Sequence, residues 1–180
     1  MKRLYAYAAL LPLLAAGACA TGPMGPPIAY GPPSGPHIFI DTPYRAADFG
    51  WSVQKGSNGI RGSSPKGYSC AGASVGLTPD GPYSRERIVK LYGSAVRADR
   101  PVSDIRSKTI GNDNADLARF VRRSRCDAQG RFSFDGLPDG GYFLIAQVSG
   151  GPEPLALMRH VVLRGGDVEA VALTMTSAPR

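Results

Sequence analysis

A short glycine-bearing string raises the question of serine chemistry. Residues 72–76 read Gly-Ala-Ser-Val-Gly, and many serine hydrolases carry a Gly-x-Ser-x-Gly string at their nucleophile. That chemistry requires a sharp turn from a strand directly into a helix, so that the serine is exposed and the helix terminus helps stabilise an oxyanion. Ser74 instead lies within an alternating apolar pattern that ends at a proline turn. The sequence therefore predicts a strand residue at this position and assigns no catalytic residue.

The arginines between residues 119 and 125 offer a different chemistry. Side chains alternate between the two faces of a strand, so a strand across this segment places Arg119, Arg123 and Arg125 on one face. Guanidinium groups bind phosphate and carboxylate oxygens. We therefore expect this face to contact an anionic partner. Protection of an edge strand against aggregation is the alternative that the pattern leaves open.

The cysteines and histidines suggest a structural bond and no metal. Cys70 and Cys126 lie about 55 residues apart, and in an exported protein such a pair is most simply a disulfide. His37 and His160 are the only histidines, and neither has zinc-ligand spacing to a cysteine. His160 has no evident partner, so we expect it to be structural. No cofactor is predicted.

The amino terminus has the order of a secretory signal. Basic residues precede an apolar run over 4–14, which is too short to span a membrane comfortably. Residues 16–19 read Ala-Gly-Ala-Cys, which resembles the lipobox of bacterial lipoproteins, except that alanine stands where leucine is usual. The resemblance implies a signal peptide over 1–18 and acyl chains on Cys19 that attach the protein to a membrane. Ordinary signal cleavage remains the alternative.

Residues 19–57 are expected to lead from this anchor to the folded domain. Repeated Gly-Pro-Pro strings within 21–36 predict an extended, solvated tether. The aromatic residues Tyr44, Phe49 and Trp51 follow, and we expect them to fix the irregular lead-in to the core rather than to stack on a sugar.

The remaining pattern is typical of an all-β protein. The 23 glycines and 16 prolines favour short strands joined by turns. Alternation predicts about seven strands in an antiparallel β-sandwich. The expected strands lie near residues 58–62, 68–78, 119–125, 131–134, 142–148, 155–163 and 168–175. The segment 127–148 forms a central hairpin in this arrangement. One short helix, capped by Ser84 and ending before Gly93, is inserted, and a polar loop follows it over 95–116. The amides and carboxylates of that loop lack the ligand spacing of a calcium site.

Four short motifs mark turns and strands within residues 58–175. They are Asn58–Gly62, 71–79, 127–134 with 137–142, and 165–168. Together they resemble the carboxypeptidase regulatory-like, or transthyretin-like, β-sandwich family. The resemblance implies a sandwich domain over 58–180 that acts as an accessory or binding module and carries no catalytic residues. The insertion over 82–116 departs from a compact version of the pattern and is where a private function could reside.

The sequence thus predicts a non-catalytic cell-envelope lipoprotein whose β-sandwich binds or organises something at the membrane surface. The formal charge of +7 is a modest excess that suits anionic envelope polymers or lipid headgroups, and a partner protein remains open. Nucleic acid is not expected. We expect export and a lipid anchor in the outer membrane, facing the periplasm or the cell surface. The alternatives are a soluble periplasmic or secreted interaction domain and, third, a serine hydrolase.

Overall fold

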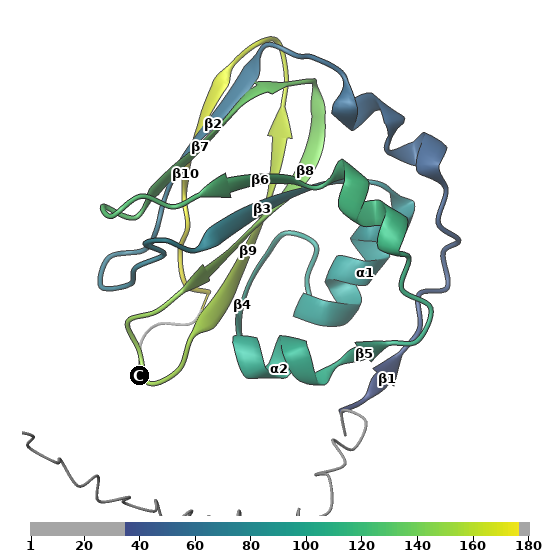
Figure 1. Ribbon diagram of the computed structural model, residues 1–180, viewed down its shortest axis with the longest axis horizontal. Coiled ribbons are helices and arrows are strands. Elements are labelled where there is room, and N and C mark those ends of the chain that lie inside the picture. Colours follow the sequence, from purple (N-terminus) through teal and green to yellow (C-terminus); the bar gives the residue numbers. More distant parts are fainter. Residues whose placement is uncertain (1–34, 177–180) are drawn as a thin grey trace, which may run out of the picture. The chain divides into compact units, whose positions relative to one another are not determined.

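Two packed β-sheets form the framework of the protein (Figure 1). The computed structural model describes residues 35–176, so the expected signal peptide, Cys19 and nearly all of the tether lie outside the described residues. The sandwich strands are β2 (Asn58–Ser63), β3 (Ser74–Pro79), β4 (Arg97–Pro101), β6 (Arg122–Arg125), β7 (Arg131–Leu137), β8 (Gly140–Val148), β9 (Leu155–Leu163) and β10 (Val168–Ala172). They form a three-stranded sheet in the order β10-β2-β7 and a five-stranded sheet in the order β4-β9-β8-β3-β6. The expected all-β sandwich is confirmed.

Alternating side chains build the core between the two sheets. Val75 and Leu77 in β3 are fully buried, and so are Leu144 and Ala146 in β8. They meet the inward side chains of the three-stranded sheet, among them Phe132. Burial of the larger of these side chains, such as valine, leucine and phenylalanine, stabilises the fold by roughly 1.5–3 kcal/mol each. The period-two pattern of these strands therefore separates a core face from an outer face on each sheet.

The segment 127–148 does not form a hairpin within one sheet. Its first strand, β7, pairs with β2, whereas its second strand, β8, pairs with β3 and β9 at the centre of the other sheet. The turn at residues 138–139 therefore carries the chain from one layer to the other. The turn at residues 164–167 does the same, because β9 lies in the five-stranded sheet and β10 pairs in parallel with β2. The expectation of a wholly antiparallel sandwich is wrong at that pair.

Buried Asn58 explains why both crossings occur at one end of the sandwich. Its amide nitrogen donates to the Leu137 carbonyl at 3.0 Å and to the Asp139 carboxylate at 2.8 Å. Its amide oxygen accepts from the Gly166 nitrogen at 2.8 Å. One side chain thus ties the two turns together, and a satisfied buried amide of this kind favours a single arrangement.

The insertion between β3 and β6 covers much of the outer face of the five-stranded sheet (Figure 1). It contains α1 (Pro82–Tyr92), α2 (Val102–Ser107), the short strand β5 (Thr109–Ile110) and the 3₁₀ helix η3 (Ala115–Phe120). The predicted helix begins three residues earlier than expected, because Gly81 and not Ser84 is its N-cap, and Ser84 accepts a hydrogen bond from the Gly81 nitrogen at 2.9 Å. Gly93 ends it in the left-handed conformation. Ile88 and Leu91 pack on Phe143 of β8.

The polar stretch over 95–116 is more ordered than a loop. It supplies β4 at the edge of the five-stranded sheet, α2, and β5, which pairs in parallel with β1 (His37–Ile38). The Asn112 side chain exchanges hydrogen bonds with the backbone of Ile40, at 2.9 and 2.7 Å. Contacts with distant segments, rather than local propensity, fix this stretch.

The aromatic residues of the lead-in anchor it to the domain, as predicted. They lie in or beside two 3₁₀ turns, η1 (Ala46–Asp48) and η2 (Gly50–Val53). Phe49 is fully buried and stacks on Tyr44 with ring centres 5.7 Å apart. Trp51 packs edge-on against Tyr142 of the core at 5.2 Å. Phe49 therefore has no exposed surface, and the half-buried Tyr44 and Trp51 use their ring contacts for packing.

Candidate functional site

A cleft lies on the outer face of the five-stranded sheet, between α2 and β6. Its volume is about 310 Å³. We call it the outer-face cleft. It is lined by Ser74, Gly76, Thr78, Val102, Ile105, Arg106, Val121, Arg123, Ile145, Gln147 and Ala156.

The floor of the cleft follows from strand alternation. Because Val75 and Leu77 face the core, Ser74, Gly76 and Thr78 face outward. Gly76 pairs with Ile145 of β8 on one side and with Arg123 of β6 on the other. A Cβ atom at Gly76 would have its nearest neighbours at 3.9 Å. Because Gly76 has no side chain, the outer face of β3 has a hollow between Ser74 and Thr78.

The two walls come from different parts of the chain. Val102 and Ile105 of α2 lie three residues apart on one helical face and pack at the edge of the cluster beneath α1. The Val102 nitrogen donates to the Pro154 carbonyl at 3.0 Å, which holds the start of α2 beside β9. Val121, just before β6, forms part of the opposite wall. The floor and walls thus combine apolar side chains with a few polar ones.

Two arginines stand at the rim, one from each wall. Arg106 of α2 and Arg123 of β6 are both exposed. Within residues 35–176 neither guanidinium has a hydrogen-bond or ion-pair partner. Each keeps its full set of donors for a ligand, and a carboxylate or phosphate group suits that geometry. The arrangement can bind an anion whose remaining surface is partly apolar and partly hydroxylated.

The structure separates the three arginines that the sequence grouped together. Arg123 and Arg125 share the outer face of β6, but the Arg125 Nε donates to the Gly72 carbonyl at 3.1 Å and lies outside the cleft. Arg119 is not in a strand at all, because residues 115–120 form η3. In that turn Leu117 is buried against Phe49. The expectation of one arginine face from Arg119 to Arg125 is therefore wrong, and whether these residues contact an anion stays a prediction.

Sequence reasoning missed Arg106. The signal that could have found it is weak: Val102 and Ile105 have helical spacing, and Arg106 follows directly. A six-residue helix carries too little of that pattern to stand out from a polar loop. Its position depends on contacts that the sequence alone does not reveal.

A larger hollow, of about 640 Å³, lies at the three-stranded sheet, and its arginines are engaged. Arg61 forms an ion pair with Asp135 at 2.7 Å, and Arg131 forms one with Asp127 at 3.1 Å. The pKa of Asp127 is lowered, mainly by a hydrogen bond from the backbone of Arg131. We favour the smaller cleft because its cations lack partners among residues 35–176, whereas a ligand at this hollow would compete with protein carboxylates.

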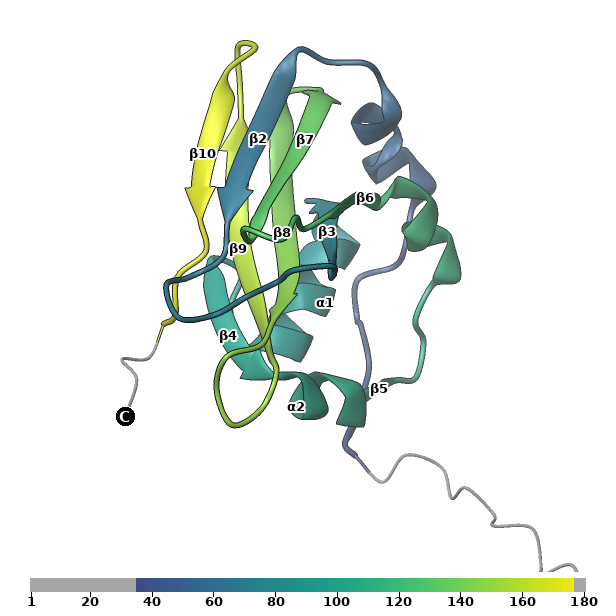
Figure 2. The same cartoon turned by 60° about the vertical axis from the view of Figure 1, so that its left-hand side comes forward.

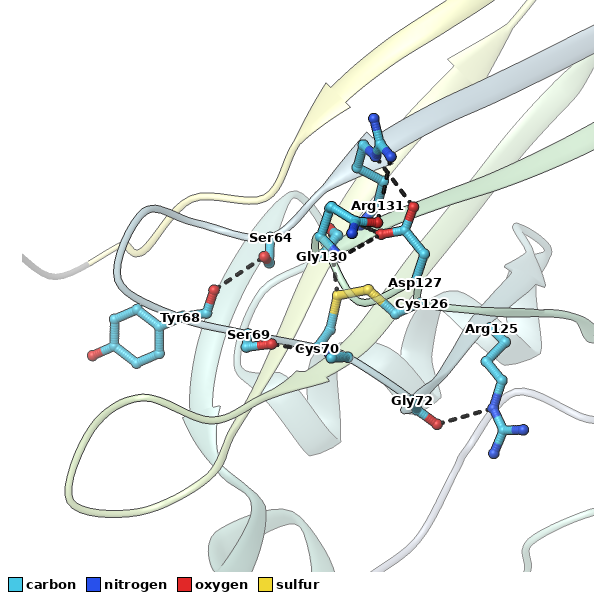
Figure 3. Close-up of a disulfide and its surroundings, with 12 residues drawn as sticks. Ser64, Tyr68, Ser69, Cys70, Gly72, Arg125, Cys126, Asp127, Gly130 and Arg131 are labelled. Atoms are coloured by element: carbon cyan, nitrogen blue, oxygen red, sulfur yellow. Dashed lines mark hydrogen bonds and ion pairs between the residues drawn. A yellow bond between two sulfur atoms is a disulfide. The ribbon is translucent and has the colours of Figure 1, made fainter.

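The predicted disulfide between Cys70 and Cys126 is confirmed (Figure 3). It joins the segment before β3 to the residue that directly follows β6, so it closes the end of the β3–β6 pair, where Cys126 also exchanges backbone hydrogen bonds with Gly72 and Ala73. Figure 3 shows Arg125 and Arg131 extending away from each other on either side of it. Asp127, next to Cys126, accepts from the backbone nitrogens of Gln129 and Arg131 at 2.9 and 2.8 Å and so fixes the turn.

His160 has a partner, contrary to expectation. Its Nε2 lies 2.8 Å from a carboxylate oxygen of Asp80, and Arg85 also pairs with that carboxylate. The His160 ring packs on Phe143 at 5.0 Å. Asp80 lies 80 residues away in the turn that leads into α1, so no local spacing could signal the pair. The group ties the start of α1 to β9.

The structure provides neither an elbow for Ser74 nor a metal cluster in the part of the chain that it describes. Ser74 is the first residue of a strand, not a residue of a strand-to-helix turn. Over residues 35–176 no group of three or more His, Cys, Asp or Glu side chains is arranged to hold a metal ion. Within the same residues, no helix is long and apolar enough to cross a membrane.

Comparison with known proteins supports the fold. A solved structure similar to this chain is a proposed carbohydrate binding protein from Pseudomonas aeruginosa, with 19% sequence identity and a TM-score of 0.54. The match covers 72% of this chain and 96% of that chain. No family model matches the chain, and no curated protein matches it. At this identity the likeness shows a shared β-rich fold.

Proposed function

We propose that this protein is a non-catalytic carbohydrate-binding module of the bacterial cell envelope, and that the outer-face cleft takes an acidic sugar. The observation that carries the proposal is the pair of guanidinium groups of Arg106 and Arg123, which lie on opposite walls of one cleft and have no partner in the part of the chain that the structure describes. Two cations that converge on a concave surface favour an anionic ligand.

The rest of the cleft suits a sugar ring. Ser74 and Thr78 offer hydroxyl groups, and Gln147 offers an amide that can both donate and accept. Ile105, Ile145 and Ala156 supply apolar surface for the CH groups of a ring. A uronic acid or a phosphorylated sugar combines one anionic group, several hydroxyl groups and an apolar ring face. The similar structure described as a proposed carbohydrate binding protein supports the same ligand class.

The cellular setting of the proposal comes from the sequence. The resemblance of the sequence to the carboxypeptidase regulatory-like family supports an accessory role for the sandwich, and Cys19 would hold the module to the membrane through acyl chains. Such a tether would place the cleft within reach of envelope polysaccharide. A soluble periplasmic or secreted module is the alternative. Labelling with a radioactive fatty acid separates the two, because the wild-type protein should incorporate label and Cys19→Ser should not.

Calorimetric titration of the full chain tests the binding proposal. The titrants are galacturonic acid oligomers and neutral maltose oligomers of the same lengths. We expect the acidic series to bind more tightly, and to bind less tightly as salt rises, because salt screens exposed charges. Gly76→Val fills the cleft and should abolish binding, whereas Ala170→Val, on the outer face of the three-stranded sheet, should not. Equal affinity for both series, or binding that survives Gly76→Val, would contradict the proposal.

A further inference from the structure

A second hollow adjoins the outer-face cleft, and it is lined by α1, η3 and the segment between β5 and η3. Its volume is about 230 Å³. We call it the Arg87–Asp113 hollow. It is lined by Thr78, Arg87, Asp113, Asn114, Ala115, Leu117, Ala118, Val121 and Arg123.

The two hollows share part of their lining. Thr78, Val121 and Arg123 line both of them. Thr78 lies on the outer face of β3, next to Gly76 in the alternation, and Val121 follows η3 directly. Arg123 therefore stands where the cleft passes into the second hollow, with its guanidinium unpartnered among the described residues.

The second hollow differs chemically from the first. Arg87 and Asp113 form a two-point ion pair, with Nε to Oδ1 at 3.0 Å and Nη2 to Oδ2 at 3.1 Å. Tyr83 donates to the same carboxylate at 3.2 Å and accepts from the Asn114 nitrogen at 2.9 Å, which holds the pair in place. A guanidinium has five N–H donors and a carboxylate oxygen can accept more than one hydrogen bond, so this ion pair keeps donors next to an acceptor. Neutral hydroxyl groups can use them without displacing the pair, whereas an anionic group would compete with the carboxylate. That combination suits two adjacent hydroxyl groups.

The volumes of the two hollows also favour a ligand that occupies both of them. Ligand pockets usually range from about 300 to 1,000 Å³, so each hollow alone lies at or below the lower end of that range. A single small unit could occupy either one. A longer ligand needs both.

We infer that the outer-face cleft and the Arg87–Asp113 hollow form one groove that takes at least two consecutive units of an acidic glycan, with the acidic group at Arg123. This inference rests on the proposed function and specifies its ligand. The first unit lies over the apolar floor between α2 and β6. The second places neighbouring hydroxyl groups against Arg87 and Asp113.

A length series tests the inference with the full chain. The probes are galacturonic acid and its oligomers of two, three and four units, with the neutral maltose series as reference. We expect the affinity of the wild-type protein to rise about tenfold from one unit to two, because the second unit adds several hydrogen bonds, and to rise less after that. Ala118→Leu fills the second hollow from the exposed side of η3. In this variant we expect the affinities for one and two units to differ by less than twofold.

Two further variants keep the test decisive. Ala115→Leu fills the same hollow from another exposed position and should repeat the result if Ala118→Leu folds poorly. Ala170→Leu makes the same kind of change on the three-stranded sheet and should leave the tenfold rise intact. A flat series in the wild-type protein, or a full rise in both blocking variants, overturns the inference while the proposed function stands. Failure of every acidic oligomer to bind better than its neutral counterpart overturns both.

Discussion

The two outer faces of this sandwich differ in whether their arginines are paired with carboxylates of the described residues. On the three-stranded sheet, Arg61 and Arg131 each pair with a carboxylate, and no described helix covers the face (Figure 2). On the five-stranded sheet, the insertion covers most of the face and leaves a cleft in which Arg106 and Arg123 have no described partner. The larger hollow is on the first face, and the cations without a partner among the described residues are on the second.

This contrast shows why volume alone is a poor guide to a binding site. A paired arginine on an open sheet face protects that face from unwanted contacts, and its charge is already balanced. An unpaired arginine at the rim of a partly apolar cleft attracts an anion and has all its donors available. The insertion creates this difference, because α2 supplies both one wall and one cation.

The largest expected effect comes from the disulfide at the end of the β3–β6 pair of the five-stranded sheet. Replacing both cysteines, as in Cys70→Ser/Cys126→Ser, frees a loop that spans 56 residues. We expect the free energy of unfolding to fall by about 4 kcal/mol, because the unfolded chain regains conformational freedom. Urea denaturation of both proteins measures the change. Equal midpoints, or gel mobility that is the same with and without reductant, would contradict the bond's role.

Two glycines allow the same substitution to be compared on the two sheets. A methyl group at Gly62 of β2 would overlap the buried ring of Phe132, so Gly62→Ala should destabilise the protein by about 1–3 kcal/mol. Gly76 of β3 has room for a methyl group, and Gly76→Ala should stabilise it by about 0.4–1 kcal/mol through the unfolded state. Chemical denaturation gives both values. Similar losses in the two variants would mean that the cleft is closed at Gly76.

Low pH should loosen the attachment of the lead-in, at residues 41–42, to α1. Glu86 of α1 has a pKa lowered to about 2, first by a hydrogen bond from the Thr42 side chain and then by the backbone nitrogens of Asp41 and Thr42. Because the folded pKa lies below the usual 4.5, this stabilisation is fully present above about pH 4.5 and is lost as the pH falls through 2. The Tm of Glu86→Gln should therefore lie below that of the wild type at pH 6. The difference should shrink toward pH 2, and a constant difference would refute this account.

The smallest expected effect concerns the paired arginines. Arg61 and Asp135 keep 52% and 67% of their side-chain surface exposed. Exposed pairs of this kind usually contribute about 0.2–1 kcal/mol. A double-mutant cycle with Arg61→Ala and Asp135→Ala should give a coupling energy in that range, and it should fall in high salt. A coupling energy well above 1 kcal/mol would contradict the interpretation of this pair as a weak, exposed interaction, on which the comparison of the two faces depends.

The sequence allowed the framework to be predicted because its signals are local. Alternation placed Val75 and Leu77 in the core, and the turn glycine Gly93 marked the end of α1. The disulfide was predicted from two cysteines together with the expectation that the chain is exported. These features depend on the spacing of apolar residues and on turn residues, both of which can be recognised within a short stretch of sequence.

The candidate site could not be predicted in the same way. Arg106 lies in a six-residue helix whose position depends on contacts with β9 and α1. Arg119 lies in η3 rather than in the expected strand, because Leu117 packs against distant Phe49. The partner of His160 is Asp80, which lies 80 residues away in the sequence. Polar segments such as 95–116 are ordered by contacts between remote parts of the chain. Hydrophobic periodicity and secondary-structure propensity carry no information about those contacts.

The most direct test compares the two pairs of arginines in one titration with a galacturonic acid oligomer. Each charge-assisted hydrogen bond contributes about 1.5–3 kcal/mol, so Arg106→Ala/Arg123→Ala should weaken binding by about 100-fold or more. Arg61→Ala/Arg131→Ala removes the same charge from the other face and should change the affinity by less than about threefold. Equal losses in the two double variants, or a larger loss from Arg61→Ala/Arg131→Ala, would contradict the assignment of the binding site to the cleft.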